Sequence, residues 1–129
     1  MIGKSLTKLL LIAAFGALGT LARYGLAGWV QRLGGAAFPW GTLAVNLAGC
    51  LLFGLVWSYA EARLWVSSQW RLAVLTGFMG AFTTMSTFMF ETGGLLRDGQ
   101  FLLALVNLAT QNLGGLAALF LGWQLGRVL

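Results

Sequence analysis

Long apolar stretches separated by single charged residues dominate the hydrophobic pattern of this chain. Uncharged runs of 28, 19 and 28 residues occupy positions 33–60, 72–90 and 99–126, and a shorter run of 14 ends at Arg23. A membrane-spanning helix needs about 20 mostly apolar residues, so the first run suffices only if Arg23 is tolerated in the span. We therefore predict an all-α membrane protein with four transmembrane helices in a single domain, residues 1–129. The helices span about residues 8–31, 39–60, 70–95 and 100–126.

Amphipathic aromatic side chains, which favour the membrane–water interface, lie near the predicted helix ends. They are Trp29, Trp40, Trp57, Tyr59, Trp65, Trp70 and Trp123. Pro39 directly precedes the second predicted helix, where a missing amide donor costs little. Both features support the four predicted spans.

The composition agrees with a chain embedded in lipid. Hydrophobic residues make up 59% of the chain and charged residues 9%, whereas about 25% of the residues in a soluble domain are charged. These values exclude a disordered chain and most soluble enzymes. The net charge of +5 is carried by cations scattered singly along the chain, which suits membrane-flanking positions better than a nucleic-acid interface.

The chain lacks the residue sets on which catalysis depends. It has no histidine, and its single cysteine, Cys50, excludes an internal disulfide and a cysteine-cluster metal site. No nucleophile with a base and no phosphate-binding loop is visible, so we predict that the protein is not an enzyme. Glu61 and Glu91 lie near predicted span ends, which favours passive conduction over proton-coupled transport.

Charge gives little information on orientation. Four spans place both termini on one side of the membrane, with five Lys and Arg residues on that side against three on the other. The positive-inside rule decides little from so small a bias. A protein with both termini inside and a chain that inserts in both orientations and pairs antiparallel are equally consistent with this count.

Small residues recur at every fourth position of the last predicted helix, at Gly114, Ala118, Gly122 and Gly126. Such a ladder allows another helix to approach closely. It serves either packing within the chain or oligomerisation, and the sequence is consistent with both.

Polar residues inside the predicted spans form four sets, and polar groups in hydrocarbon are costly unless they face protein or water. Asn46 lies on the second helix and Arg23 on the first, whereas Asn107 and Gln111, four residues apart, share a face of the last. Thr83, Thr84, Ser86 and Thr87 crowd the third helix. Each set suits hydrogen bonding between helices, but together the four sets favour a polar pathway.

The third segment is the most informative. Gly77, Gly80 and the four hydroxyl residues favour a helix that is broken in mid-membrane, since glycine weakens a helix and Ser and Thr bond to backbone groups. A break exposes carbonyls that can hold a cation and amides that can face an anion. The alternative is a continuous helix whose hydroxyls bond to the preceding turn.

Three motifs carry a resemblance to a known family. They are GALGTLARY at 16–24, PWGTLAVNLAGCLLFG at 39–54 and TGFMGAFTTMSTFMFET at 76–92. The third is similar to the pattern GFxGGxTTFSTF of the Fluc fluoride channels, also called CrcB proteins, and the last helix ends in LGR as expected. The resemblance implies a fluoride-selective channel of the bacterial inner membrane, built as an antiparallel dual-topology homodimer, through which fluoride leaves the cytoplasm passively.

The resemblance also implies site residues. The pore asparagine of the family corresponds to Asn46, its two pore phenylalanines to Met85 and Phe88, and its hydroxyl track to Ser86 and Thr87. Arg23 corresponds to an arginine that draws anions towards the entrance. Carbonyls of Gly80 and Thr83 correspond to those that hold a structural Na⁺ at the dimer axis. Glu91 corresponds to a family glutamate without an assigned role.

Two positions depart from the family pattern. Met85 replaces a phenylalanine and offers a flexible thioether instead of a ring edge. Asn107 and Gln111 stand where a tyrosine and a serine are usual, and their amide N–H groups can also donate to fluoride. The alternative is a subunit that has lost one pore or that pairs with a different chain.

Two rival functions belong to other classes. Proton-coupled small multidrug exporters have a similar length and helix number, but they require a glutamate in the first helix, and residues 9–22 contain no acid. A non-transporting scaffold subunit would leave the polar cluster of the third helix unexplained.

Overall fold

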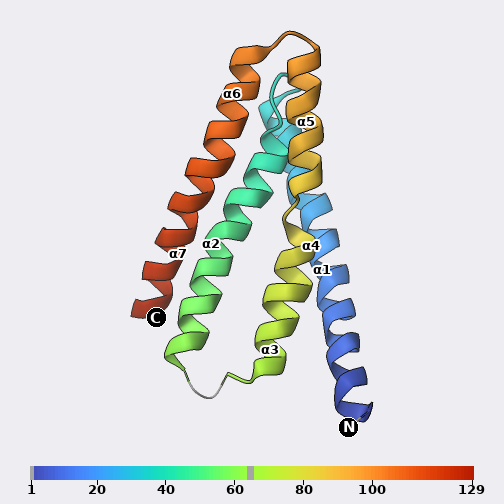
Figure 1. Cartoon of the computed structure of the whole chain (residues 1–129), viewed down its shortest axis with the longest axis vertical. Coiled ribbons are helices and arrows are strands. Elements are labelled where there is room, and N and C mark those ends of the chain that lie inside the picture. Colours follow the sequence, from blue (N-terminus) through green and yellow to red (C-terminus); the bar gives the residue numbers. More distant parts are fainter. Residues whose placement is uncertain (1, 64–65) are drawn as a thin grey trace.

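The computed structural model describes residues 2–63 and 66–129, so that Trp65, predicted at a membrane interface, lies outside the described residues. The chain runs up and down four times (Figure 1). The first two passes are α1 (Ile2–Gly34) and α2 (Trp40–Ala62). The third comprises α3 (Ser68–Leu72), the π-helical η1 (Ala73–Met79), α4 (Gly80–Phe82) and α5 (Met85–Arg97). The fourth comprises α6 (Phe101–Ala109), the π-helical η2 (Thr110–Gly114) and α7 (Gly115–Val128).

All four passes are long and apolar enough to cross a membrane. The helical segments that meet this criterion are Ser5–Gly34, Trp40–Ala62, Ser68–Arg97 and Phe101–Val128. The prediction of an all-α chain with four such helices is therefore confirmed. Arg23 lies inside the first span and does not interrupt it.

Glycines in the left-handed region end two of the passes. Gly35 follows α1 with φ +83°, and Gly99 lies between α5 and α6 with φ +74°. Residues with a Cβ rarely adopt these angles, so glycine allows the chain to turn sharply at these points. Both turns lie at the end of the molecule opposite the two termini (Figure 1).

Arginines stack on aromatic rings at the end that carries the termini. The guanidinium carbon lies 4.4 Å from the ring centre in the Arg63–Tyr59 pair, 4.8 Å in Arg71–Trp57 and 5.5 Å in Arg127–Trp123. Cations and amphipathic rings gathered at one level are typical of a membrane–water interface.

The tightest helix pair is α2 with α7, and small residues make it possible. A Cβ at Gly122 would meet the carbonyl oxygen of Leu51, and one at Gly54 would meet that of Leu119. Ser58, which is fully buried, donates from Oγ to the Trp123 carbonyl at 2.8 Å. The small-residue ladder of the last helix is thus used, at Gly122 and Gly126, for packing within the chain.

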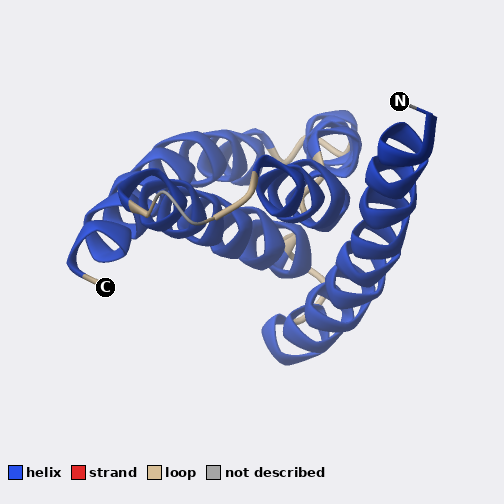
Figure 2. Cartoon of the chain, turned by 90° about the horizontal axis from the view of Figure 1, so that it is seen from below, coloured by secondary structure: helices blue, strands red, loops and turns tan. Residues whose placement is uncertain are grey.

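Helix α1 stands apart from the other three passes (Figure 2) and is largely exposed. It contacts the third pass where Gly19 meets the Phe78 backbone and Gly77 meets the Ile12 backbone. Glycine on both sides of the crossing permits direct backbone contact. Most of the α1 surface therefore remains free for lipid or for another chain.

The third pass is not one regular helix. Helix α4 ends at Phe82 and α5 begins at Met85. Between them, Thr83 (φ −88°, ψ 161°) and Thr84 (φ −150°, ψ 116°) are extended, and the ribbon narrows there (Figure 1). These two residues form the interruption around which the polar side chains gather.

We expect Gly122→Ala to lower the free energy of unfolding by about 1–3 kcal/mol, since the added methyl forces α7 away from the α2 backbone. Tryptophan fluorescence during thermal unfolding in detergent measures the effect. Gly25→Ala is the matched control, because its Cβ meets nothing within 4 Å. Equal stability of the two variants would contradict the close α2–α7 packing.

Candidate functional site

The side chain of Asn46 binds both backbone groups of Thr84 and supplies the acceptor that the Thr84 amide lacks in the interrupted helix. Asn46 Oδ1 accepts a hydrogen bond from the Thr84 amide at 2.8 Å, and Asn46 Nδ2 donates to the Thr84 carbonyl at 3.1 Å. A side-chain amide has the donor and acceptor of a peptide group, so one residue of α2 satisfies both backbone groups of Thr84. Asn46 thereby joins α2 to the interruption.

Thr84 also caps the helix that follows. Its Oγ1 accepts a hydrogen bond from the Thr87 amide at 3.2 Å and donates to Thr87 Oγ1 at 3.0 Å. Threonine is a preferred residue at this position, because its hydroxyl satisfies an otherwise unpaired amide of the first turn. The sequence therefore starts a new helix directly after the interruption.

Because of these bonds, two backbone amides do not donate to the carbonyls that they would bind in a continuous helix. Gly80 would accept from the Thr84 amide, which donates to Asn46, and Thr83 would accept from the Thr87 amide, which donates to Thr84 Oγ1. Within residues 2–63 and 66–129, neither carbonyl receives the usual i+4 bond. Gly80 is exposed, whereas Thr83 is half-buried.

A chain of side-chain amides continues from Asn46 across the fourth pass. Asn46 Nδ2 donates to Gln111 Oε1 at 2.9 Å, and Gln111 Nε2 lies 3.5 Å from Asn107 Oδ1. Asn107 Nδ2 donates to Thr92 Oγ1 at 3.0 Å, which in turn donates to the Phe88 carbonyl at 2.7 Å. The chain begins at the backbone of Thr84 and returns to the backbone of α5.

A cavity of about 230 Å³ opens at this chain of polar groups. Among the predicted site residues, Asn46, Thr83, Met85, Phe88 and Gln111 line it. Its lining also includes Cys50, Thr84 and Asn112 and carries no charged residue. The structure thus brings residues from three passes together around one cavity. Its lining is uncharged, and most of the polar side chains in it are hydrogen-bonded.

The predicted residues differ widely in exposure. Phe88 is 4% exposed and Gln111 7%, whereas Met85 is 66% exposed. Ser86 and Thr87 are exposed on the outer surface of the single chain. Asn107 is fully buried and does not line the cavity. Met85 and Phe88 are three positions apart, so they share a side of α5, but only Phe88 is covered by this chain.

Two charged residues predicted for the site lie away from the cavity. Arg23 is half-buried on α1. It lies on the same face of α1 as Gly19, which approaches the third pass, and Ala27, which approaches α2. Glu91 Oε1 accepts a hydrogen bond from Thr42 Oγ1 at 2.8 Å. Glu91 lines a separate cavity of about 270 Å³, towards the Gly99 turn.

Sequence reasoning did not name Thr84 and Thr92 of this network as site residues, nor Thr42, which bonds Glu91 outside it. Thr84 has a local signal, since threonine is a preferred N-cap residue. Its hydroxyl can accept from the backbone amide three positions later, here that of Thr87. Thr92 and Thr42 have none, because their partners Asn107 and Glu91 are 15 and 49 residues away along the chain. Only the packing of the passes brings these pairs together.

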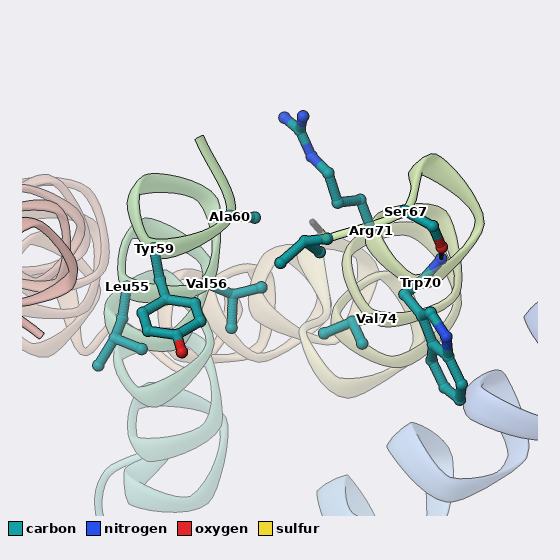
Figure 3. A pocket seen from close by; sticks show the side chains of 9 residues that line it. Leu55, Val56, Tyr59, Ala60, Ser67, Trp70, Arg71 and Val74 are labelled. Carbon is teal, nitrogen blue, oxygen red and sulfur yellow. Dashed lines mark hydrogen bonds between the residues drawn. The ribbon is translucent and has the colours of Figure 1, made fainter. Parts of the chain in front are cut away.

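A larger cavity, about 560 Å³, lies elsewhere, between α2 and α3 at the end that carries the termini. Val56 of α2 and Val74 lie on opposite sides of it (Figure 3). Its lining is mostly apolar, and none of the predicted site residues contributes to it. The polar cavity at the interruption is therefore the candidate functional site.

Fold and site together define a multi-pass membrane protein with an uncharged polar cavity between its helices. The chain belongs to the CrcB family: the sequence model of that family, described as CrcB-like protein, Camphor Resistance (CrcB), matches residues 10–123. The predicted family membership is thereby confirmed.

Curated bacterial relatives cover almost the whole chain. A protein of Nitrosococcus oceani named Fluoride-specific ion channel FluC is 54% identical over 122 residues, 95% of this chain and 98% of the relative. A protein of the same name from Solidesulfovibrio magneticus is 55% identical over 124 residues, 96% and 99% of the two chains. A third, from Desulforapulum autotrophicum, is 51% identical over 122 residues, 95% and 98% of the two chains.

We expect Thr92→Val to reduce the free energy of unfolding by about 1–3 kcal/mol, because it leaves the buried Asn107 amide without its acceptor. Chemical unfolding in detergent measures the change. Thr92→Val keeps the volume and removes the hydroxyl, whereas Thr92→Ser keeps the hydroxyl and removes a methyl group, so Thr92→Ser is expected to stay closer to the wild type. If both variants unfold alike, the Asn107–Thr92 bond contributes nothing measurable.

Proposed function

We propose that this chain forms a fluoride-selective channel through which fluoride leaves the bacterial cytoplasm passively, across the inner membrane. Relatives named as fluoride-specific channels, at about half identity over nearly the whole chain, support this function. The observation that carries it is the uncharged polar cavity at the interruption of a chain that is otherwise apolar.

The chemistry of the cavity suits fluoride. Fluoride is small and strongly hydrated, so a channel must replace its water with hydrogen-bond donors. Amides and hydroxyls supply donors without a fixed positive charge, and conduction requires binding that is weak enough for release. The ring edge of Phe88 carries the positive end of its quadrupole and adds an uncharged contact for an anion.

In this proposal the site residues have distinct roles. The anion path is formed by Asn46, Met85, Ser86, Thr87, Phe88, Asn107 and Gln111. Arg23, half-buried on α1, draws anions towards the entrance through its charge. Glu91 remains without an assigned role, since it lines the separate cavity.

The active form is, in this proposal, an antiparallel dual-topology homodimer. Ser86 and Thr87 are exposed on a helix that belongs to a membrane span, and hydroxyls facing lipid are costly. A second copy placed over the interruption would cover them and enclose the open side of the cavity. The interruption would then lie in mid-membrane, where protein satisfies its irregular backbone.

The carbonyls of Gly80 and Thr83 suit a structural Na⁺ at the dimer axis. Both lack their usual helical donors, and Gly80 is exposed in the single chain. Oxygen atoms are the ligands that hard cations prefer. A bound Na⁺ would offset the negative ends of these carbonyl dipoles and hold the two chains together.

Proton-coupled drug export is not favoured. Helix α1 contains no Asp or Glu between Ile2 and Gly34, whereas such exporters require a carboxylate there. Glu91 lies six residues before Arg97, where the third span ends, and is paired with Thr42. The chain therefore has no carboxylate placed to carry protons through the centre of the bundle.

We expect purified protein in liposomes loaded with fluoride to release the ion, as followed with a fluoride electrode, and to retain chloride in parallel vesicles. Protein-free vesicles are the control. Equal release of chloride would contradict selectivity. A stable homodimer that releases no fluoride would contradict the proposed channel, and activity restored by a second chain would point to a heteromer.

We expect Phe88→Ile to reduce fluoride flux by roughly two- to tenfold while the dimer stays intact, because the ring-edge contact is lost. Phe101→Ile is the matched control, since Phe101 is 68% exposed at the start of α6 and does not line the cavity. Size-exclusion chromatography checks the assembly of both variants. Unchanged flux in Phe88→Ile would exclude this ring from the path.

A further inference from the structure

The orientation of the Asn46 amide is fixed by backbone. The Thr84 N–H must meet an acceptor, so Asn46 Oδ1 faces it at 2.8 Å, and rotating the amide by 180° would oppose two donors. Nδ2 therefore faces the Thr84 carbonyl and Gln111 Oε1, at 3.1 and 2.9 Å. Both N–H groups of Asn46 are thus engaged within the chain.

The orientation of Gln111 follows from that of Asn46. Because Oε1 accepts from Asn46, Nε2 lies on the other side of the Gln111 amide. One N–H is directed at Asn107 Oδ1, at 3.5 Å, longer than a standard N–H···O bond. Among the described residues, the second N–H has no acceptor, and Gln111 lines the 230 Å³ cavity.

Asn107 and Thr92 complete the sequence of fixed orientations. Thr92 Oγ1 donates to the Phe88 carbonyl, so it accepts from Asn107 Nδ2, and Asn107 Oδ1 is left to face Gln111. Each amide is thus oriented by the next, between the Thr84 amide at one end and the Phe88 carbonyl at the other. Gln111 also lies in η2, and π-helical turns often occur at functional sites.

We propose that Gln111, and not Asn46, presents the amide N–H that contacts fluoride in this chain, and that Asn46 and Asn107 are positioning residues that hold the Gln111 amide in this orientation. The inference rests on the proposed channel function. It revises the role of Asn46 from pore donor to partner of the interrupted backbone, and that of Asn107 from pore lining to buried acceptor.

Fluoride flux in liposomes tests the donor. Gln111→Met keeps the length of the side chain and removes the N–H, so flux is expected to fall roughly tenfold or more. The matched control is Gln124→Met on α7, where the side chain is exposed and lies outside the cavity. Near wild-type flux in a folded Gln111→Met dimer would overturn the proposal.

A second measurement does not depend on conduction. In wild-type protein labelled with ¹⁵N at Asn and Gln side chains, NMR signals are followed as sodium fluoride is added, with sodium chloride as the reference. The Gln111 signal, assigned by its absence in Gln111→Met, is expected to shift with fluoride while that of Asn46 stays in place. A shift of the Asn46 signal alone would overturn the proposal.

The positioning role of Asn107 has its own readout. Asn107→Leu is expected to raise the fluoride concentration at which the Gln111 signal reaches half its shift. Asn107→Gln keeps both the oxygen that accepts from Gln111 and the N–H group that donates to Thr92, and is expected to restore that concentration towards the wild-type value. Equal titrations of all three proteins would overturn this role. Wild-type vesicles that release no fluoride would instead contradict the channel function itself.

Discussion

The pairing of Asn46 with the backbone of Thr84 is the interaction on which the rest of the site depends. An interrupted helix leaves amide and carbonyl groups unpaired, and hydrocarbon offers nothing to bind them. Asn46 Oδ1 accepts from the Thr84 amide at 2.8 Å, in place of the missing helical acceptor, and Nδ2 donates to the Thr84 carbonyl at 3.1 Å. Two extended residues can therefore stand inside an apolar bundle, and the polar groups around them can face a cavity.

Packing elsewhere in the bundle places the partners within reach. Asn46 bonds Gln111 at 2.9 Å where the fourth pass lies close to α2. Beside this bond, Gly114 and Gly115 meet Leu47 and Cys50 of α2. Small residues that carry no chemistry themselves thus allow the two helices to approach each other next to the polar chain. Farther along the pair, Gly54 and Gly122 keep the α2–α7 contact internal to the chain.

The sequence predicted the four helices well, since charge and hydropathy alone mark segments long enough to span a membrane. It also placed Asn107 and Gln111 on one face, because a separation of four is a local property of a helix. It did not predict that Asn107 would be fully buried or that Thr92 would be its partner. Such contacts depend on how separate passes meet, and helical spacing carries no information about that.

The distribution of charge makes the cavity suitable for passage and not for storage. Arg23 and Glu91 lie outside its lining, which holds only neutral groups. A fixed cation beside fluoride would bind it strongly and slow its exit, whereas neutral dipoles replace hydration without trapping the ion. Met85 contributes no ring edge, so in the proposed channel more of the contacts that replace the hydration of fluoride come from amide donors. A single N–H held by neighbouring amides, at Gln111, has the directionality that replacing water around a small anion requires.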